Sequence, residues 1–350
     1  MQEKDINKNI YRSCENIEMF HVQINGRIDN GDSFIYPCCT MSINNHTIAS
    51  TSLLDTTEDT VKKFFEIRHN MIEENKKIYY KNISERLYTK YCEGCSKYVI
   101  KEWNSIDEKI QYINLSMYPS PCQAKCIYCY VERHENLNDD DVKKSYEKLF
   151  NFLSYLKETN VIDENTVWQI CPGEITIHPY RNKIYDLVGN NHAFFLTNGF
   201  VFDIDIANKL RMNKSTSIYV SLDSGTSETW KKVKGVDNFN SVIENLNKYY
   251  EYCDSNIYGQ IILKYIIIPG INTTRKDYDG ILDIIKRFHI KRFIISREIG
   301  NKTSSISEQR TVLMKAIKLA SLCKLNNVEF EFADELYTPD DIEYIKQHIK

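Results

Sequence analysis

Short apolar runs alternate with amphipathic stretches from about residue 109 to the end of the chain. Apolar runs bounded by turn residues predict strands, and apolar residues at helical spacing predict helices. Six strands are expected at residues 109–117, 166–171, 192–199, 216–225, 257–269 and 291–296. Amphipathic helices are expected between them at residues 141–160, 179–188, 203–212, 227–233, 239–253 and 274–289. Because strands that alternate with helices pair in parallel, the pattern predicts an α/β fold.

The number of strand–helix units narrows this fold class. Six units are too few for a complete barrel of about 250 residues, so residues 106–300 are expected to form a partial (β/α)6 TIM-like barrel. Residues 301–350 are expected to add a C-terminal α/β extension, with a helix near 305–325, a strand within 328–334 and a short last helix. In such sheets, binding sites lie at the carboxyl ends of the strands.

Residues 1–105 lack this alternation. They contain β-like pieces at 19–28 and 32–39, a helical stretch at about 57–85, and the sequence YCEGC at 91–95. We therefore expect a small, separate, cysteine-rich α+β domain that ends between residues 100 and 108.

Composition excludes several functional classes. The net charge is −3 and no run of Lys and Arg is present, so the sequence does not predict nucleic-acid binding. The first ten residues, MQEKDINKNI, have no apolar core typical of a secretory signal. The most apolar stretch, residues 261–271, is too short to span a membrane, which takes about 20 apolar residues. We expect a cytoplasmic protein without a membrane span.

The chain has eleven cysteines, which in a cytoplasmic protein indicate metal or redox chemistry rather than disulfides. Cys122, Cys126 and Cys129 follow the first barrel strand with the spacing C-x3-C-x2-C. With His134 they make four ligands, the number that structural zinc needs. The alternative is an iron–sulfur cube held by three thiolates, which leaves one iron open to a small molecule.

The loop CQAKCIYCY (122–130) resembles the cysteine loop of the radical SAM superfamily, with Tyr128 at its aromatic position. Further similarity follows in order along roughly residues 109–300. PGE at 172–174 resembles the family's Gly-Gly-Glu motif, with Pro172 in place of the first glycine. The other similar segments are TNG at 197–199, SLDSGTSETWKKVKG at 221–235 and IIIPGIN at 266–272.

The resemblance implies a cofactor and a reaction. Three cysteines, Cys122, Cys126 and Cys129, would bind a 4Fe-4S cluster, and S-adenosylmethionine would chelate the fourth iron. One electron would release a 5′-deoxyadenosyl radical that abstracts a hydrogen atom from a substrate. A flavodoxin- or ferredoxin-type protein would donate the electron. The residues expected to contact S-adenosylmethionine are Tyr128, Gly173, Glu174, Asn198, Ser221 and Asp223.

The cysteines of the first domain resemble those of a SPASM-like auxiliary-cluster domain, here placed before the barrel. An early cysteine, a hairpin ending in a cysteine, a helix and a final C-x2-C follow that pattern. The implied ligands are Cys14, Cys38, Cys92 and Cys95, with Cys39 as the alternate for Cys38. A structural zinc site fits the same spacing.

The substrate is expected to be a small molecule or a peptide. A carbohydrate or sugar nucleotide undergoing epimerisation, dehydration or oxidation is the first reading, because no leader-binding winged helix is visible. A peptide-modifying enzyme is the alternative, and a non-catalytic metal-binding scaffold is the third. Cys171, beside the PGE motif, is a candidate hydrogen donor for an epimerase or else a buried strand cysteine. Further candidates that could equally be ordinary surface or paired side chains are Lys264, Arg297, Glu298, His178 and His192.

Overall fold

The computed structural model describes residues 10–27, 34–38, 50–77, 91–92, 95, 99–102, 106–118, 120–129, 140–171, 173–253, 258–298, 306–333 and 336–349. The chain divides into two compact units. The first unit comprises Met1–Ser120, His134–Pro172 and Asn182–His192, and the second comprises Pro121–Arg133, Gly173–Arg181 and Ala193–Lys350. None of the helices described is both long and apolar enough to cross a membrane.

The first unit holds a four-strand sheet in the order β6-β5-β2-β3. Strands β2, β5 and β6 are parallel, and β3 pairs antiparallel with β2. Strands β1 and β4 form a separate antiparallel pair. All but Arg181 of α4 lies in this unit. The elements are β1 (Ile10–Ser13), α1 (Glu15–Glu18), β2 (His21–Arg27), β3 (Phe34–Tyr36), α2 (Thr57–Lys77), β4 (Val99–Glu102), β5 (Tyr112–Tyr118), α3 (Asp140–Glu158), β6 (Val167–Ile170) and α4 (Arg181–Val188).

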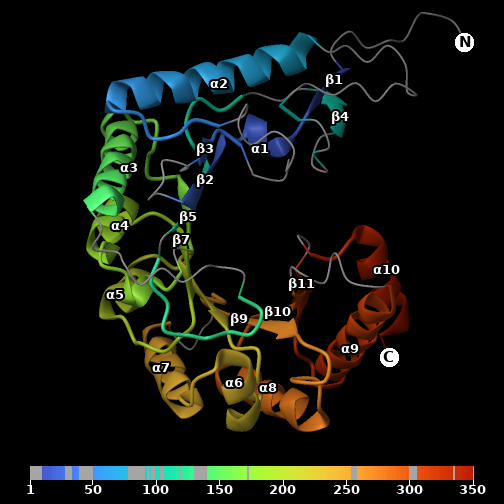
Figure 1. Ribbon diagram of the computed structural model, residues 1–350. Helices are drawn as coiled ribbons and strands as arrows, with labels where there is room; N and C mark the ends of the chain where they lie inside the picture. The colour runs from blue at the N-terminus through green and yellow to red at the C-terminus, as the bar shows by residue number, and fades with distance from the viewer. Residues whose placement is uncertain are drawn as a thin grey trace, which may run out of the picture. The chain divides into compact units, whose positions relative to one another are not determined.

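The second unit holds five parallel strands in the order β11-β10-β9-β8-β7. In Figure 1 the helices α5, α7 and α8 lie on the outer side of these strands. The elements are η2 (Ile175–Ile177), β7 (Ala193–Thr197), α5 (Ile204–Met212), β8 (Ser217–Ser221), α6 (Ser227–Lys234), α7 (Phe239–Tyr252), β9 (Ile261–Ile267), α8 (Arg275–Arg287), β10 (Arg292–Arg297), α9 (Ile306–Leu325), β11 (Glu331–Phe332) and α10 (Pro339–His348).

The predicted α/β class is confirmed. Strands β5 to β10 follow one another along the chain with helices between them, as the alternation of apolar runs required. The expected C-terminal extension contains α9, β11 and α10, although β11 is only two residues long.

The amino-terminal part differs from the expectation in one respect. Residues 21–27 pair in parallel with β5 over seven positions, so β2 extends the sheet that was expected to start with β5. The sequence missed this pairing because β2 reads as part of a hairpin and parallel pairing has no local signal. The domain boundary near residue 105 stays a prediction. The expected helix at 57–85 is described as far as Lys77.

Candidate cofactor site

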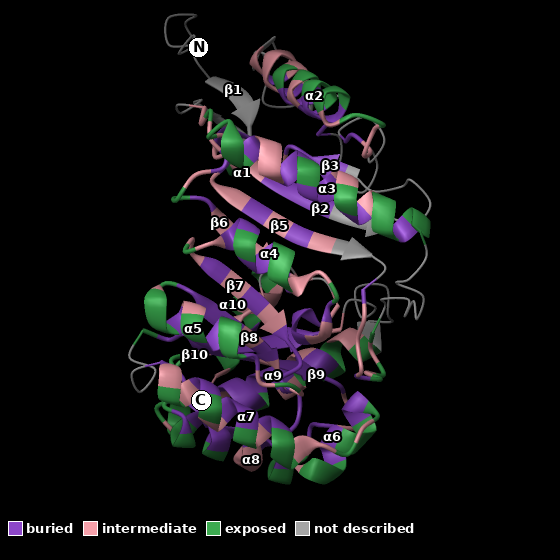
Figure 2. Cartoon of the chain, turned by 90° about the vertical axis from the view of Figure 1, so that its left-hand side faces the viewer, coloured by how far each residue is buried: buried purple, intermediate pink, exposed green. Residues whose placement is uncertain are grey.

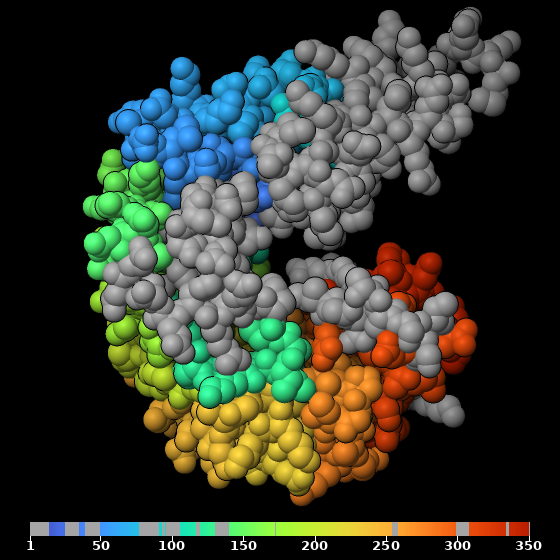
Figure 3. All heavy atoms as spheres, in the orientation of Figure 1, coloured from blue at the N-terminus to red at the C-terminus, as the bar shows by residue number. Residues whose placement is uncertain are grey.

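The loop that carries the cysteine triplet belongs to the second unit. Cys122 and Cys126 are half-buried, Cys129 is exposed, and the Cys129 backbone N–H donates to the Cys126 carbonyl at 3.1 Å. Figure 3 shows the green atoms of this loop at the surface beside the yellow atoms of the second unit. Within the described ranges, no three His, Cys, Asp or Glu side chains converge closely enough to hold one metal ion. An iron–sulfur cube distributes its thiolates over separate irons.

The C-terminal end of α6 holds the cysteine loop through its backbone. The N–H groups of Lys125 and Ile127 donate to the carbonyls of Lys234 and Val233 at 2.7 and 3.0 Å. These carbonyls lie in the last turn, where a helix leaves carbonyls without partners. Gly235 follows with φ +69°, and a Cβ on it would lie 2.6 Å from the Lys125 Cβ. The close contact between the end of α6 and the cysteine loop therefore favours glycine at position 235, directly after the Lys234 carbonyl that accepts from the loop.

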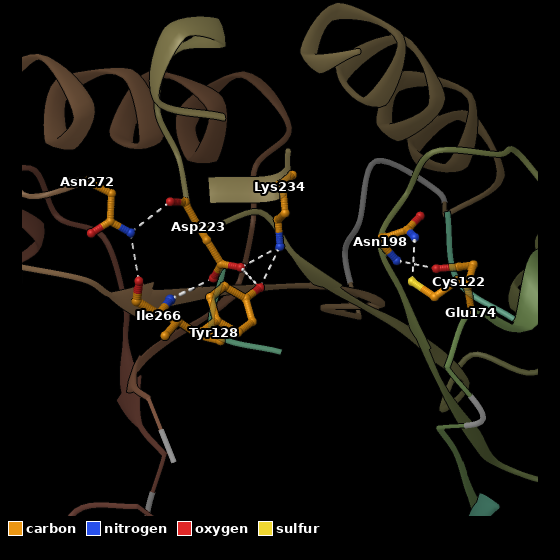
Figure 4. Close-up of polar contacts among 8 residues, drawn as sticks. All are labelled: Cys122, Tyr128, Glu174, Asn198, Asp223, Lys234, Ile266 and Asn272. Atoms are coloured by element: carbon orange, nitrogen blue, oxygen red, sulfur yellow. Dashed lines mark hydrogen bonds and ion pairs between the residues drawn. The ribbon is translucent and has the colours of Figure 1, made fainter. Parts of the chain in front are cut away.

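A buried polar network joins the loop to the end of β8 (Figure 4). Lys234 Nζ lies 2.6 Å from Asp223 Oδ2 and 2.7 Å from the Tyr128 hydroxyl, which itself donates to Asp223 Oδ2. The Lys234 and Asp223 side chains are 1% and 0% exposed. Burial and the neighbouring Asp223 carboxylate raise the pKa of Tyr128 well above its usual value, so its hydroxyl remains a donor. The ring of Tyr128 is thus fixed beside Cys126 and Cys129.

Asn272 supports this network from the segment after β9. Its side-chain Nδ2 donates to the carbonyls of Asp223 and Ile266 at 2.9 and 2.7 Å, and its Oδ1 accepts from the Ile268 N–H. The Ile266 N–H donates to Asp223 Oδ1 at 2.7 Å. Asp223 has φ +52°, a left-handed conformation that costs energy outside glycine. The bonds from Asn272 and Ile266 stabilise this strained residue. With Ile266 on Oδ1, and Tyr128 and Lys234 on Oδ2, both oxygens of the Asp223 carboxylate accept hydrogen bonds.

Glu174 is fully buried and links the loop to the end of β7. Its carboxylate accepts hydrogen bonds from the hydroxyls of Thr176 and Thr197, both at 2.7 Å, and from the Asn198 N–H at 2.6 Å. Its own N–H donates to the Pro121 carbonyl at 2.8 Å. Burial raises the pKa of the Glu174 carboxyl, and these hydrogen bonds oppose the rise. Gly173, which precedes it, has φ +62°, so the turn favours glycine there.

The surroundings of the thiols fit an iron–sulfur group. Burial raises the pKa of the Cys122 and Cys126 thiols, and Lys234 partly lowers that of Cys126. Bound iron would supply the positive charge that keeps buried thiolates ionised. The Asn198 Nδ2 donates to Cys122 Sγ at 3.7 Å (Figure 4). It also donates to Gln123 Oε1 at 3.4 Å. Three thiolates with an amide donor beside one of them match the donor set of a cube with one open iron.

The structure also describes the surroundings of the candidates Ser221, Arg297 and Cys171. Ser221 is partly exposed at the end of β8, where it pairs in register with Lys264. Arg297 is 3% exposed and contacts the C-terminal extension, with Nη1 at 3.8 Å from Asp341 Oδ2 and its guanidinium 5.8 Å from the Tyr337 ring. Cys171 is partly exposed and belongs to the first unit. Pro172 and His134 lie outside the described residues.

The first unit brings the predicted auxiliary ligands together. Cys14 and Cys92 belong to one buried cluster, against which Cys38 and Cys95 pack. Asn75, which is fully buried, donates to Cys92 Sγ at 3.7 Å. Cys39 lies outside the described residues.

The sequence missed two residues of the second-unit network. Lys234 and Asn272 lie inside the quoted segments, but only the fold shows that both contact Asp223. The sequence indicated only that both residues belong to segments that follow strands. It did not indicate which side chains of those segments are buried.

Comparison with known proteins places this site in a family. Residues 120–285 match the family model described as the radical SAM superfamily. A probable GTP 3′,8-cyclase of Saccharolobus islandicus (strain L.S.2.15 / Lassen #1) is 32% identical over 131 residues, 36% of this chain and 39% of that protein. The GTP 3′,8-cyclase of Microcystis aeruginosa is 25% identical over 205 residues, 55% of this chain and 58% of that protein. The matches thus span less than two thirds of either relative.

Solved structures show weaker similarity. Streptococcus suis SuiB bound to the precursor peptide SuiA is 16% identical, with a TM-score of 0.46 over 93% of this chain and 71% of that chain. A radical SAM methyltransferase from Sphaerobacter thermophilus is 10% identical, with a TM-score of 0.38 over 61% of this chain and 63% of that chain. The family match shows that residues 120–285 contain a radical SAM domain, of the kind that holds a 4Fe-4S cluster and S-adenosylmethionine.

Proposed function

We propose that the protein reductively cleaves S-adenosylmethionine and abstracts a hydrogen atom from a carbohydrate or sugar nucleotide, leading to epimerisation, dehydration or oxidation. The observation that carries the first part is the cysteine loop, which α6, Glu174 and the Tyr128–Asp223–Lys234 network hold from three sides. This support holds a partly exposed triplet whose three thiols are free of disulfides.

Some residues of the site would bind the cluster, and others position the cysteine loop. Cys122, Cys126 and Cys129 would hold the cluster, and Asn198 would donate to a sulfur of it. When bound, the cluster and S-adenosylmethionine supply the chemistry: one electron breaks a carbon–sulfur bond of the sulfonium, giving methionine and a 5′-deoxyadenosyl radical that takes a hydrogen atom from the substrate. The expected electron donor is a flavodoxin- or ferredoxin-type protein. Tyr128 keeps the loop at a fixed distance from β8.

A small sugar-containing substrate is favoured by the relatives. Their names state an activity on GTP, a nucleotide that contains a ribose. If the reaction is an epimerisation, Cys171 is our candidate for returning a hydrogen atom to the substrate radical. The partial exposure of its side chain supports that role over a purely structural one.

An auxiliary iron–sulfur cluster in the first unit is the second part of the proposal. Cys14, Cys38, Cys92 and Cys95 come from three separate segments of the chain, yet all four belong to or pack against one cluster of buried residues. Loop closure of this kind costs entropy, which bound metal would offset. Structural zinc at the same four thiols is the outcome that metal analysis would distinguish.

The test of the first part is S-adenosylmethionine cleavage. Protein reconstituted with iron and sulfide under anaerobic conditions and reduced with dithionite is expected to release 5′-deoxyadenosine. Replacement of all three loop cysteines by Ala should abolish the product. Cys253→Ala with Cys323→Ala is the matched control, because both thiols are buried in the second unit away from the loop. Continued cleavage by the triple variant would show that the assignment is wrong.

Metal counting on the same triple variant tests the auxiliary cluster. We expect iron to fall but to remain, with an iron–sulfur absorption band, because the first unit keeps its own four thiols. Zinc in place of the remaining iron would contradict this part of the proposal and leave the first part intact. Deuterium transfer from labelled sugars, sugar nucleotides and peptides into 5′-deoxyadenosine then identifies the substrate class.

A further inference from the structure

The sheet of the first unit has two unlike faces. Along β2, β5 and β6 the side chains of one face are apolar and almost fully buried: Val22, Ile24, Ile113, Leu115, Trp168 and Ile170. Parallel strands are usually apolar on both faces, because layers cover both. Here the alternate positions on the second face are mostly polar and partly exposed, a pattern that Figure 2 shows along β5 as alternating buried and intermediate colours.

This second face, which we call the amide face, includes His21, Gln23, Tyr112, Asn114 and Gln169, and Val167 stands opposite Tyr112 on it. The strand register places Gln23 opposite Asn114 and Asn114 opposite Gln169, so three amides stand in one row across three strands. Neighbouring strands lie about 4.8 Å apart, which is then the spacing of the row. In the adjacent row, the rings of His21 and Tyr112 lie 4.7 Å apart between centroids.

The amide face has hydrogen-bonding capacity that the protein leaves unmet. His21 Nε2 and Asn114 Oδ1 are both buried, and neither atom has a hydrogen-bond partner among the residues that the structure describes. A buried polar atom without a partner costs about 1–3 kcal/mol, so native structures retain few of them without a reason. Burial also lowers the pKa of His21 to about 4, which leaves its imidazole neutral at pH 7. Gln169 Oε1 accepts from the Tyr112 hydroxyl, so the rows are linked to each other.

The position of the face along the chain connects it to the chemistry. Strand β5 runs into the cysteine loop, and β6 runs through Cys171 into Gly173 and Glu174. Sites of parallel α/β sheets lie at these carboxyl ends. Alternation beyond Gln169 places Cys171 on the amide face as well, since its N–H continues the ladder by donating to Leu115.

We propose that the amide face binds the neutral, hydroxyl-rich part of a substrate, a sugar ring. A hydroxyl group both donates and accepts, and so does a carboxamide, so a row of amides matches neighbouring ring hydroxyls. The described side chains of this face carry no charge, which argues against a carboxylate or phosphate there. The identification of this ligand as the substrate rests on the proposed function.

The test is binding to the reconstituted protein by saturation-transfer NMR. The probes are glucose, galactose, N-acetylglucosamine and uridine, with tetra-alanine as the peptide comparison. Asn114→Leu and Gln169→Met remove amides at nearly constant volume, and Gln347→Met on the exposed end of α10 is the matched control. We expect at least one sugar probe to bind, each amide variant to weaken its affinity by about tenfold, the loss of roughly one hydrogen bond, and the control to bind normally.

A second measurement does not depend on variants that must fold. The ring resonances of His21 in the unaltered protein should shift when the bound sugar is added, because its Nε2 gains a partner. Absence of saturation transfer to every sugar probe, unchanged affinity in both amide variants, or preferential binding of tetra-alanine would each overturn the proposal. Sugar binding without deuterium transfer into 5′-deoxyadenosine would instead overturn the carbohydrate reaction and leave the binding face standing.

Discussion

The buried ion pair between Lys234 and Asp223 gives the sharpest quantitative test of the site. The Lys234→Met variant keeps the length of the side chain and removes its ammonium group. Asp223 then remains buried, and among the described residues its carboxylate keeps the hydrogen bonds from the Tyr128 hydroxyl and the Ile266 N–H. A buried charge that loses its partner is costly because the surrounding protein cannot replace the solvation of water.

The magnitude follows from the complete burial of the pair. Removing one partner of a buried ion pair destabilises a protein by about 3–5 kcal/mol. The chain has 350 residues. With an unfolding entropy of about 2.1 cal/mol/K per residue, that loss lowers the unfolding temperature by about 4–7 °C.

Calorimetry of the reconstituted protein measures this shift directly. Lys232→Met is the matched control, because Lys232 lies on the same helix but pairs with Glu228 at the surface, where its side chain is 60% exposed. We expect the control to unfold close to the temperature of the unaltered protein, since exposed pairs contribute little. The double variant Lys234→Met with Asp223→Asn should recover part of the loss, because it removes the uncompensated charge.

Equal unfolding temperatures for Lys234→Met and Lys232→Met would refute the reasoning. So would a double variant that is less stable than Lys234→Met alone, since the cost would then not come from an unpaired carboxylate. Iron content measured on each sample separates loss of stability from loss of the cluster.

Three further predictions follow from the same geometry. Gly235→Ala should lower stability by about 1–3 kcal/mol and reduce iron retained after gel filtration, because φ is +69° and the new Cβ would meet Lys125; unchanged iron and stability would contradict the contact. Asn198→Ala should lower the reduction potential of the loop cluster in an EPR titration, because a donor to Cys122 Sγ is lost; an unchanged or higher potential would rule the donor out. Burial lowers the pKa of His178 from 6.5 to about 4. Between these pH values the unfolded chain binds more protons at His178 than the folded protein does. The free energy of unfolding should therefore fall by up to about 3 kcal/mol as the pH drops from 6.5 to 4. His178→Gln should flatten that acid dependence in chemical denaturation, and an unaltered profile would show that His178 does not cause it.

The order of the motifs could be predicted from the sequence because each one has a local signal. The spacing of Cys122, Cys126 and Cys129, the turn at Asn198 and the strand–helix alternation all depend on neighbours within a few residues. In the structure, Thr226 caps the beginning of α6 and Gly235 ends it, and both residue types are favoured at those positions.

The partners of these residues could not be predicted in that way. Lys234 is one of four lysines in residues 229–248. Nothing in the neighbouring sequence indicates that this lysine is the buried one. Glu174 has its acceptor sites filled by Thr197 and Asn198, which lie more than twenty positions away. Such contacts depend on which strands become neighbours, and parallel pairing joins segments that a whole helix separates.

The sequence by itself therefore determined the strand–helix order, the cysteine loop and its resemblance to the radical SAM superfamily, because periodicity and spacing are local properties. Only the tertiary structure decided that β2 joins β5, that Lys234 and Asn272 contact Asp223, and that Cys14, Cys38, Cys92 and Cys95 share one buried cluster. It also decided that Gln23, Asn114 and Gln169 form one row. The physical reason is that register and burial are set by packing between distant segments, which no stretch of the chain encodes alone.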